Sequence, residues 1–147
     1  AYAAEATDPT VKARQELMDT QLANVKILGG MAGGDVPFDA AAAEAAKATL
    51  IATSAEIGAK FEMQAEDEKS KAKPEIWTNW EDFLAKAGAL NAAATAMDVS
   101  SPETIGAGMA AIGGACTEFH KSYQIPRSRR SALLMKRSGT EIPGRNY

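Results

Sequence analysis

The chain has 147 residues, with 16 Lys and Arg against 19 Asp and Glu, one Cys and one His. This length corresponds to one domain with its own core, a single Cys excludes an internal disulfide, and no apolar run is long enough to span a membrane. Residues up to Gln124 carry a net charge of −8 and residues 125–147 a net charge of +5, and the acidic body argues against nucleic-acid binding.

The first predicted helix begins at Asp8 or Thr10, either of which can cap it, and runs to about Leu28. Its apolar positions are three, four or seven residues apart and predict one buried face: Val11, Met18, Leu22, Val25 and Gly29. The stretch "GGMAGGDVPFD" then breaks the chain. Asp39 opens a second helix, whose expected inner face is Ala43, Ala46, Leu50, Ile57 and Phe61.

The third predicted helix begins near Pro74 and carries a sustained apolar stripe: Ile76, Trp80, Phe83, Ala87, Leu90, Ala94 and Met97. Ser101 as N-cap and Pro102 in the first turn open the last helix. Its expected inner face is Ile105, Met109, Ile112, Cys116, Phe119 and Tyr123. Four amphipathic helices with modest connections predict an all-α antiparallel four-helix bundle over residues 1–124. Residues 125–147 would form a basic tail, extended or disordered.

The stretch "GGACTEFHKSYQ", residues 113–124, holds the lone Cys116 and the lone His120. Positions i and i+4 of a helix lie on one side, so both side chains can face one object. Haem suits the pair because a thiol can bond to the ring edge while an imidazole reaches the iron, whereas zinc needs about four ligands. A Cys–His nucleophile pair would need an orienting acid from another helix. A buried Cys beside a surface His also fits the spacing.

Four segments occur in an order that resembles cytochrome c prime, a four-helix-bundle c-type cytochrome: "VKARQELM", "VPFDAAAAEAAKATL", "KPEIWTNWEDF" and "GGACTEFHKSY". The resemblance covers residues 8–124, is closest to the low-spin, methionine-ligated members, and implies haem between the helices near the C-terminal helix. In that family the last motif is C-x-x-C-H followed by an aromatic residue. The resemblance therefore implies a thioether from Cys116, the proximal iron ligand in His120, and the aromatic residue in Tyr123.

Phe119 stands where the second haem-binding Cys of the family would be. The resemblance thus implies haem c with one thioether, through Cys116, and the alternatives are non-covalent haem b or loss of haem. Phe119 would then pack against the ring. The neighbouring Gly113 and Gly114 would let a flat group approach the helix closely.

The resemblance also implies roles for residues of the first and third helices. Met18, four residues after Arg14, would lie over the iron, where a thioether gives a low-spin site and favours the ferrous state. Without haem, Met18 would be a core residue. Arg14 would lie near the haem edge, and without the resemblance it would be a solvated charge. Trp77 would border the haem cavity, although Trp80 belongs to the predicted stripe and either residue suits the core.

These observations predict a periplasmic monohaem cytochrome that carries single electrons between redox partner proteins, without enzymatic turnover. The alternatives are a five-coordinate haem protein that binds nitric oxide or carbon monoxide, and an apo helical bundle with a structural role. The opening residues "AYAAEATDPT" are typical of a mature exported protein. Gly29, Gly30 and the alanines 40–43 would allow a homodimer through the first two helices, and no membrane insertion is expected.

Overall fold

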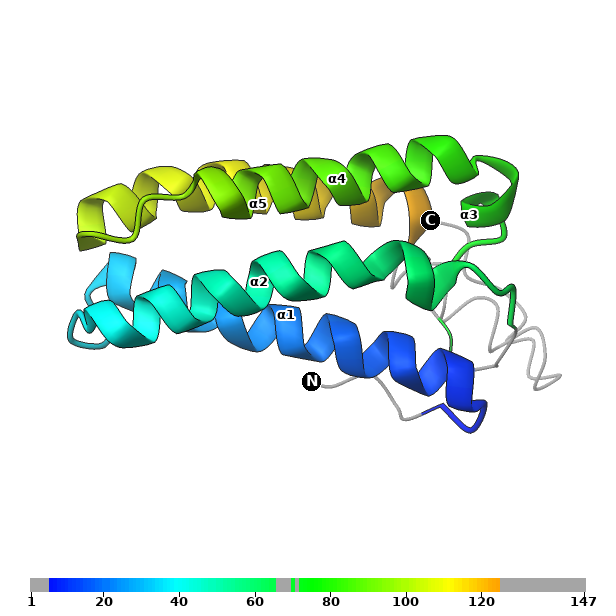
Figure 1. Cartoon of the computed structure of the whole chain (residues 1–147), viewed down its shortest axis with the longest axis horizontal. Coiled ribbons are helices and arrows are strands. Elements are labelled where there is room, and N and C mark those ends of the chain that lie inside the picture. Colours follow the sequence, from blue (N-terminus) through cyan, green and yellow to red (C-terminus); the bar gives the residue numbers. More distant parts are fainter. Residues whose placement is uncertain (1–5, 66–69, 71, 125–147) are drawn as a thin grey trace, which may run out of the picture.

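The computed structural model describes residues 6–65, 70 and 72–124, and four long helices lie side by side in it (Figure 1). They are α1 (Pro9–Gly33), α2 (Ala40–Phe61), α4 (Trp80–Ala96) and α5 (Pro102–Tyr123), and the short helix α3 (Glu75–Thr78) precedes α4. α1 packs against α2 and α5, and α4 packs against the same two helices. The predicted all-α four-helix bundle is confirmed. The predicted tail 125–147 lies outside the described residues.

The first helix is longer than the sequence predicts. The Asp8 side chain accepts hydrogen bonds from the backbone N–H of Thr10 and Val11, which confirms one of the two expected caps. The helix does not end at Leu28 but continues to Gly33, and Gly34, with φ +80°, ends it. Tertiary packing explains the extension, because Leu28 and Met31 are both buried in this last part and burial outweighs the weak helix propensity of glycine.

The buried face of α1 also differs from the predicted stripe. Val11 is buried as expected, and the rest of the buried face consists of Arg14, Leu17, Gln21, Leu28 and Met31. Met18 and Val25 are only partly buried, and Leu22 is 47 % exposed. These three side chains line a cavity between α1 and α5. The sequence periodicity therefore marked an apolar face correctly, but the middle of that face, at Met18, Leu22 and Val25, borders a cavity.

The other predicted faces agree more closely with the structure. All five positions expected on the inner face of α2 are buried. The third predicted helix is interrupted at Asn79, which has φ −118° and ψ 44°, so α3 and α4 are separate helices. Trp80 is partly buried, and the other six positions of that stripe are buried. In α5 the Ser101 cap is confirmed, with Thr104 as its partner in a capping box.

The core lies between the four helices and is built from large apolar side chains. The largest fully buried ones are Phe83, Leu28, Leu50, Ile57, Ile76, Ile105, Ile112 and Val11. Within the part of the chain that the structure describes, none of the helices is both long and apolar enough to cross a membrane.

Candidate functional site

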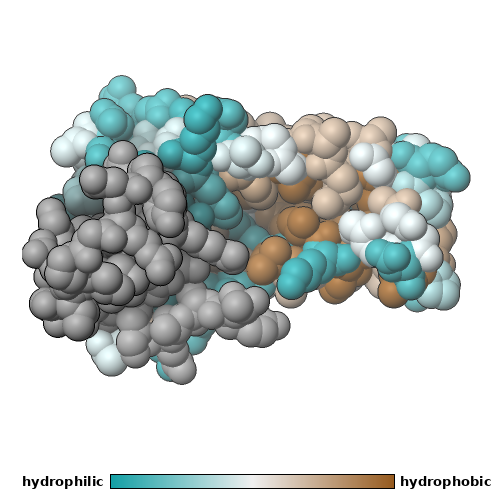
Figure 2. All heavy atoms as spheres, turned by 180° about the vertical axis from the view of Figure 1, so that it is seen from behind, coloured by the Kyte–Doolittle hydropathy of each residue, from teal (hydrophilic) through white to brown (hydrophobic). Residues whose placement is uncertain are grey.

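A cavity of about 460 Å³ lies between α1 and α5. Its walls are mainly apolar, and residues from the end of α2, the following connection and α3 complete them: Phe61, Ser70, Ala72 and Ile76. Figure 2 shows the molecule from behind, with hydrophobic side chains visible in the middle of that face. The volume lies within the range of about 300–1,000 Å³ that is usual for small-molecule sites.

The α5 wall of the cavity contains both Cys116 and His120. The helix continues to Tyr123, so the two residues lie one turn apart and border the same space, as their spacing predicts. His120 is exposed, in the last turn of α5, and its ring centre lies 6.1 Å from that of Phe119. Burial raises the pKa of the Cys116 thiol. A raised pKa disfavours the thiolate, so the structure gives no support to an activated Cys–His nucleophile pair.

The α1 wall of the cavity contains Met18, with Leu22 and Val25 on the following turns. Residues three, four and seven positions apart lie on one side of a helix. A thioether therefore lines the same cavity as the imidazole of His120, and it comes from a different helix. Whether Met18 binds iron stays a prediction.

Arg14, also on the cavity wall, is a buried cation and not a solvated surface charge. It is 3 % exposed, and its Nε donates a hydrogen bond of 2.9 Å to the carbonyl of Lys60, while an Nη donates to the carbonyl of Met63. Burial lowers its pKa, and the charge of Asp8 partly opposes that shift. The other terminal nitrogen, Nη1, is buried without a hydrogen-bond partner among the described residues. The site thus holds a donor that an anionic ligand could satisfy.

Trp77 is the one predicted site residue that does not line the cavity. Its indole nitrogen donates a hydrogen bond of 2.8 Å to the carbonyl of Phe61. The guanidinium of Arg14 lies over both rings, 4.9 Å from the centre of Phe61 and 5.3 Å from that of Trp77. Trp77 therefore supports the cavity indirectly, by packing against Arg14.

Phe119 lies on the cavity wall and belongs to an aromatic cluster centred on Phe83. The centre of the Phe83 ring lies 5.0 Å from that of Phe119 and 5.3 Å from those of three other rings: Phe61, Trp80 and Tyr123. Only 8 % of Phe119 is exposed. The residue that replaces the second Cys of the family motif is thus an integral part of the core.

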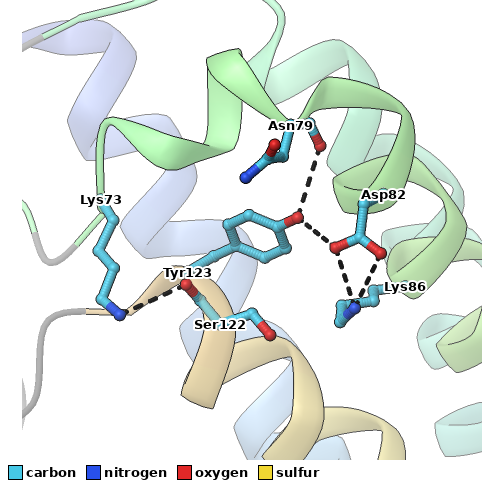
Figure 3. Close-up of polar contacts among 6 residues, drawn as sticks. All are labelled: Lys73, Asn79, Asp82, Lys86, Ser122 and Tyr123. Atoms are coloured by element: carbon cyan, nitrogen blue, oxygen red, sulfur yellow. Dashed lines mark hydrogen bonds and ion pairs between the residues drawn. The ribbon is translucent and has the colours of Figure 1, made fainter.

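Tyr123 joins the cavity wall to α4 (Figure 3). Its hydroxyl donates a hydrogen bond to the Asp82 carboxylate and also lies 3.4 Å from the Asn79 carbonyl, and Lys86 pairs with Asp82 at 2.9 Å. Burial and the neighbouring carboxylate raise the pKa of Tyr123 to about 12. The hydrogen bonds from Tyr123 and Lys86 lower the pKa of Asp82. These contacts fix the end of α5.

Several cavity residues were not predicted from the sequence, and Gln21 is the most informative of them, whereas Gly113 was expected beside a flat group. Gln21 is 7 % exposed, and its amide nitrogen is buried without a hydrogen-bond partner among the described residues. Its position three residues after Met18 could have indicated that Gln21 lies on the cavity side of the helix, but glutamine is usually exposed. A Cβ atom added at Gly113 would have no atom within 4 Å, so the helix backbone is open to the cavity there.

The residues around the cavity fit haem better than a bare metal ion. No group of three or more His, Cys, Asp and Glu is placed to hold a metal among the described residues. A porphyrin needs an apolar wall, an axial ligand and a partner for its carboxylates. The cavity offers these in its apolar lining, in His120 and in the unsatisfied nitrogen of Arg14, and Cys116 adds a thiol. The fit therefore agrees with the cofactor that the resemblance implies.

Comparison with known proteins agrees with this interpretation. The profile of the family described as Cytochrome C' matches residues 9–124. Cytochrome c-556 of Agrobacterium fabrum is 30 % identical over 120 residues, which cover 80 % of this chain and 82 % of that protein. Cytochrome c-554 of Cereibacter sphaeroides is 31 % identical over 121 residues, covering 78 % and 79 % respectively.

Two solved structures show the same fold. A structure of oxidized cytochrome c556 from R. palustris has a TM-score of 0.73 at 25 % identity and covers 81 % of this chain and 98 % of its own. A nitric oxide complex of a cytochrome c prime variant from Alcaligenes xylosoxidans has a TM-score of 0.71 at 25 % identity, covering 80 % and 94 %. The family match extends from the first residue of α1 to the C-cap of α5, and the chain therefore belongs to the cytochrome c' family.

Proposed function

We propose that this c-type haem protein carries single electrons, with His120 and Met18 as the two axial ligands of the iron. The observation that carries the proposal is that an imidazole on α5 and a thioether on α1 line one cavity. The similarity to proteins named cytochrome c-556 and c-554 supports it. No substrate turnover is proposed.

Haem bound in the cavity would supply an iron that alternates between the ferric and the ferrous state. A thioether opposite an imidazole favours the ferrous state and raises the reduction potential. Met18 would also occupy the position that a small gas would need. Leu22, Val25 and Ile112 keep the surrounding wall apolar, which limits the access of water and further tunes the potential.

We propose that Cys116 attaches the haem through a single thioether. The thiol would add across one vinyl group: an S–C bond forms, the vinyl double bond becomes single, and the thiol proton moves to the neighbouring carbon. Phe119 offers no second thiol. Intact mass under denaturing conditions tests this, because the haem mass stays with the chain only if the bond exists. Haem absorbance in the folded protein with the mass of the bare chain would instead indicate haem b.

Arg14 would bind a carboxylate of the haem through Nη1. Its other two nitrogens, Nε and Nη2, already donate to the carbonyls of Lys60 and Met63, so the guanidinium is fixed before the ligand arrives. A hydrogen bond between charged groups is stronger than one between neutral groups. This interaction would orient the ring.

We propose that the protein works in the periplasm with redox partner proteins, as its family suggests. A homodimer stays a prediction, and the structure changes which residues could support it. A Cβ at Gly29 would lie 3.9 Å from Met109, one at Gly30 would lie 3.3 Å from Val36, and Ala43 is fully buried. Gly29, Gly30 and Ala43 thus pack within their own chain, whereas Ala40 and Ala41 are exposed and stay available for a dimer contact.

The alternative function is the binding of small gases at a five-coordinate iron. It is favoured by the structural similarity to the nitric oxide complex of a cytochrome c prime variant. In this case Met18 would stay off the iron and act as part of the cavity wall.

Optical spectra of the haem-loaded protein separate the two functions. We expect six-coordinate, low-spin spectra in both oxidation states, and we expect Met18→Leu to give a high-spin ferric form that binds carbon monoxide when reduced. Met31→Leu is the matched control, because Met31 is buried in α1 but does not line the cavity. A high-spin wild type that Met18→Leu leaves unchanged would support gas binding, and a missing Soret band would contradict both functions.

A further inference from the structure

The amide of Gln21 is unusual because it is buried on the cavity wall without a hydrogen-bond partner. Gln21 is 7 % exposed, and its Nε2 has no partner among the described residues. Leaving a buried amide donor unsatisfied is unfavourable, and nearly all buried polar groups in proteins have a partner. The contacts within the described part of the folded chain therefore do not explain why an amide is buried at this position.

The surroundings of Gln21 indicate which partner the amide would find. Met18, Leu22 and Val25 line the cavity on the same part of α1, and a residue three positions from Met18 lies beside it on the helix surface. Arg14 also has an unsatisfied donor, but its guanidinium is held by carbonyl groups at the end of α2. Asp19 also lines the cavity, but it is exposed and lies two positions from Gln21, and residues two apart on a helix do not face each other. The partly buried thioether of Met18 is therefore the acceptor on the Gln21 side of α1.

We propose that Gln21 is a positioning residue that donates a hydrogen bond from its amide to the sulfur of Met18 when haem fills the cavity. The inference rests on the proposed ligation by Met18. A thioether sulfur is a weak acceptor, and one lone pair stays available after the other has bound iron. The hydrogen bond would hold the sulfur toward the iron and draw electron density from it. The loss of electron density from the sulfur would favour the ferrous state, and the fixed position of the side chain would slow the dissociation of Met18.

The experiment compares haem-loaded Gln21→Leu with Asn24→Leu. Asn24 is the matched control because it carries an amide on the same helix but does not line the cavity, and its Nδ2 already donates a hydrogen bond of 2.8 Å to the Thr20 carbonyl. In Gln21→Leu we expect the ratio of reduced to oxidised protein at a fixed potential to fall about threefold, which is the size of one modest hydrogen bond. We also expect the reduced protein to bind carbon monoxide faster. Asn24→Leu changes neither quantity.

A double variant tests whether the effect passes through Met18. In the Met18→Leu background, Gln21→Leu should produce no further shift in potential. A shift that persists there would overturn the proposal, as would wild-type behaviour of Gln21→Leu. If Gln21→Leu does not fold, Gln21→Asn replaces it, because the shorter side chain moves the amide away from Met18. We expect Gln21→Asn to show the same fall in the ratio of reduced to oxidised protein. If Met18→Leu alone leaves the spectrum unchanged, Met18 does not bind the iron and the proposed function is wrong. If Met18→Leu changes the spectrum but Gln21→Leu has no effect, only the hydrogen bond from Gln21 is wrong.

Discussion

Arg14 is a cation held by main-chain carbonyls and aromatic rings, with no carboxylate bonded to it among the described residues. The carbonyl of Lys60 belongs to the last turn of α2, where the helix dipole favours positive charge. The guanidinium lies over the rings of Phe61 and Trp77, and such contacts favour arginine over lysine. Neutral groups therefore hold the guanidinium in place, with only a charge–charge attraction from Asp8, and an anion in the cavity can still bind to it.

We expect Arg14→Lys to lower the free energy of unfolding by about 1–3 kcal/mol. Lysine cannot maintain both carbonyl contacts and both ring contacts, and a buried donor or acceptor without a partner has a cost of this size. Chemical denaturation of the haem-loaded proteins measures the difference. Lys12→Arg, at an exposed position of the same helix, is the control and should change little. Equal stability of Arg14→Lys and wild type would show that the fixed guanidinium geometry is unimportant.

Tyr123 should make stability fall at high pH. Its pKa is about 12 in the folded protein against an ordinary value of 10.0, so the unfolded chain loses this proton first. The contribution is complete below pH 10 and is lost as the pH rises toward about 12. We therefore expect the free-energy difference between wild type and Tyr123→Phe to shrink across this range, as measured by denaturation at several pH values. A difference independent of pH would contradict the assigned hydroxyl contacts.

Among single residues, chemistry and spacing singled out only Cys116 and His120, and the family resemblance supplied Met18, Arg14, Phe119 and Tyr123. All six line the cavity. The resemblance placed Trp77 on the cavity wall, but the ring lies against Arg14 instead, because a family motif does not record how neighbouring side chains pack in this chain. Gln21 was missed because its burial results from the packing of α1 against other helices, and no local pattern records that.

Among the elements, α5 forms the wall that would carry most of the bonds to haem. Its glycines 113 and 114 are both exposed, and a Cβ added at either would have no atom within 4 Å. Only Gly113 lines the cavity. The two positions thus share a helix and a local environment but differ in whether a side chain would enter the cavity.

We expect Gly113→Leu to reduce haem retention strongly, whereas Gly114→Leu should retain haem and gain about 1 kcal/mol of stability. Both substitutions replace a poor helix former by a good one, so their difference isolates the effect on the cavity. Haem content per chain and thermal unfolding provide the two measurements. Equal haem content in the two variants would mean that the ring does not approach the helix at Gly113.

At the element scale, the sequence predicted every long helix but not every boundary. Asp8 and Ser101 were correct caps because capping is a local interaction. The C-terminus of α1 was wrong because helix packing overrode the glycines, and the break at Asn79 was missed. The carbonyl of Asn79 accepts a hydrogen bond from the backbone N–H of Phe83 and lies 3.4 Å from the Tyr123 hydroxyl. Tyr123, which is distant in sequence, thus contacts the residue at which α3 and α4 are separated.

For the whole molecule, haem would connect the first and last helices of the bundle. The cavity separates α1 from α5 over the N-terminal half of one and the C-terminal half of the other. A ligand bound from both walls would stabilise the native state but not the unfolded chain. A covalent bond would also keep haem with the chain during unfolding.

We expect the melting temperature of wild type to be independent of protein concentration, and that of haem-loaded Cys116→Ser to fall on dilution. A ligand that can leave stabilises according to its free concentration, whereas an attached one does not. Calorimetry at several concentrations, with and without added haem, measures both. Dissociation of a dimer would also cause a fall on dilution, but added haem would not reverse it. If added haem also raises the melting temperature of the wild type, the haem is not covalently attached.

The fold as a whole was predictable because amphipathic helices and short connections leave few arrangements. The cavity was not predictable from pattern alone. Met18, Leu22 and Val25 have the spacing of a core stripe, and their spacing is the same whether a helix or a cofactor covers them. Only the resemblance placed haem there, and the structure shows the space between the helices.

Phe119 limits which single substitutions this chain can accept. A second thioether would require Cys at this position, but the phenyl ring is buried against Phe83. Replacing a buried Phe by a much smaller side chain typically removes about 3–5 kcal/mol, a large part of the stability of a small domain. A cysteine there would need larger side chains around Phe83 at the same time. The packing beneath Phe119 is therefore a barrier to completing the family motif by one mutation.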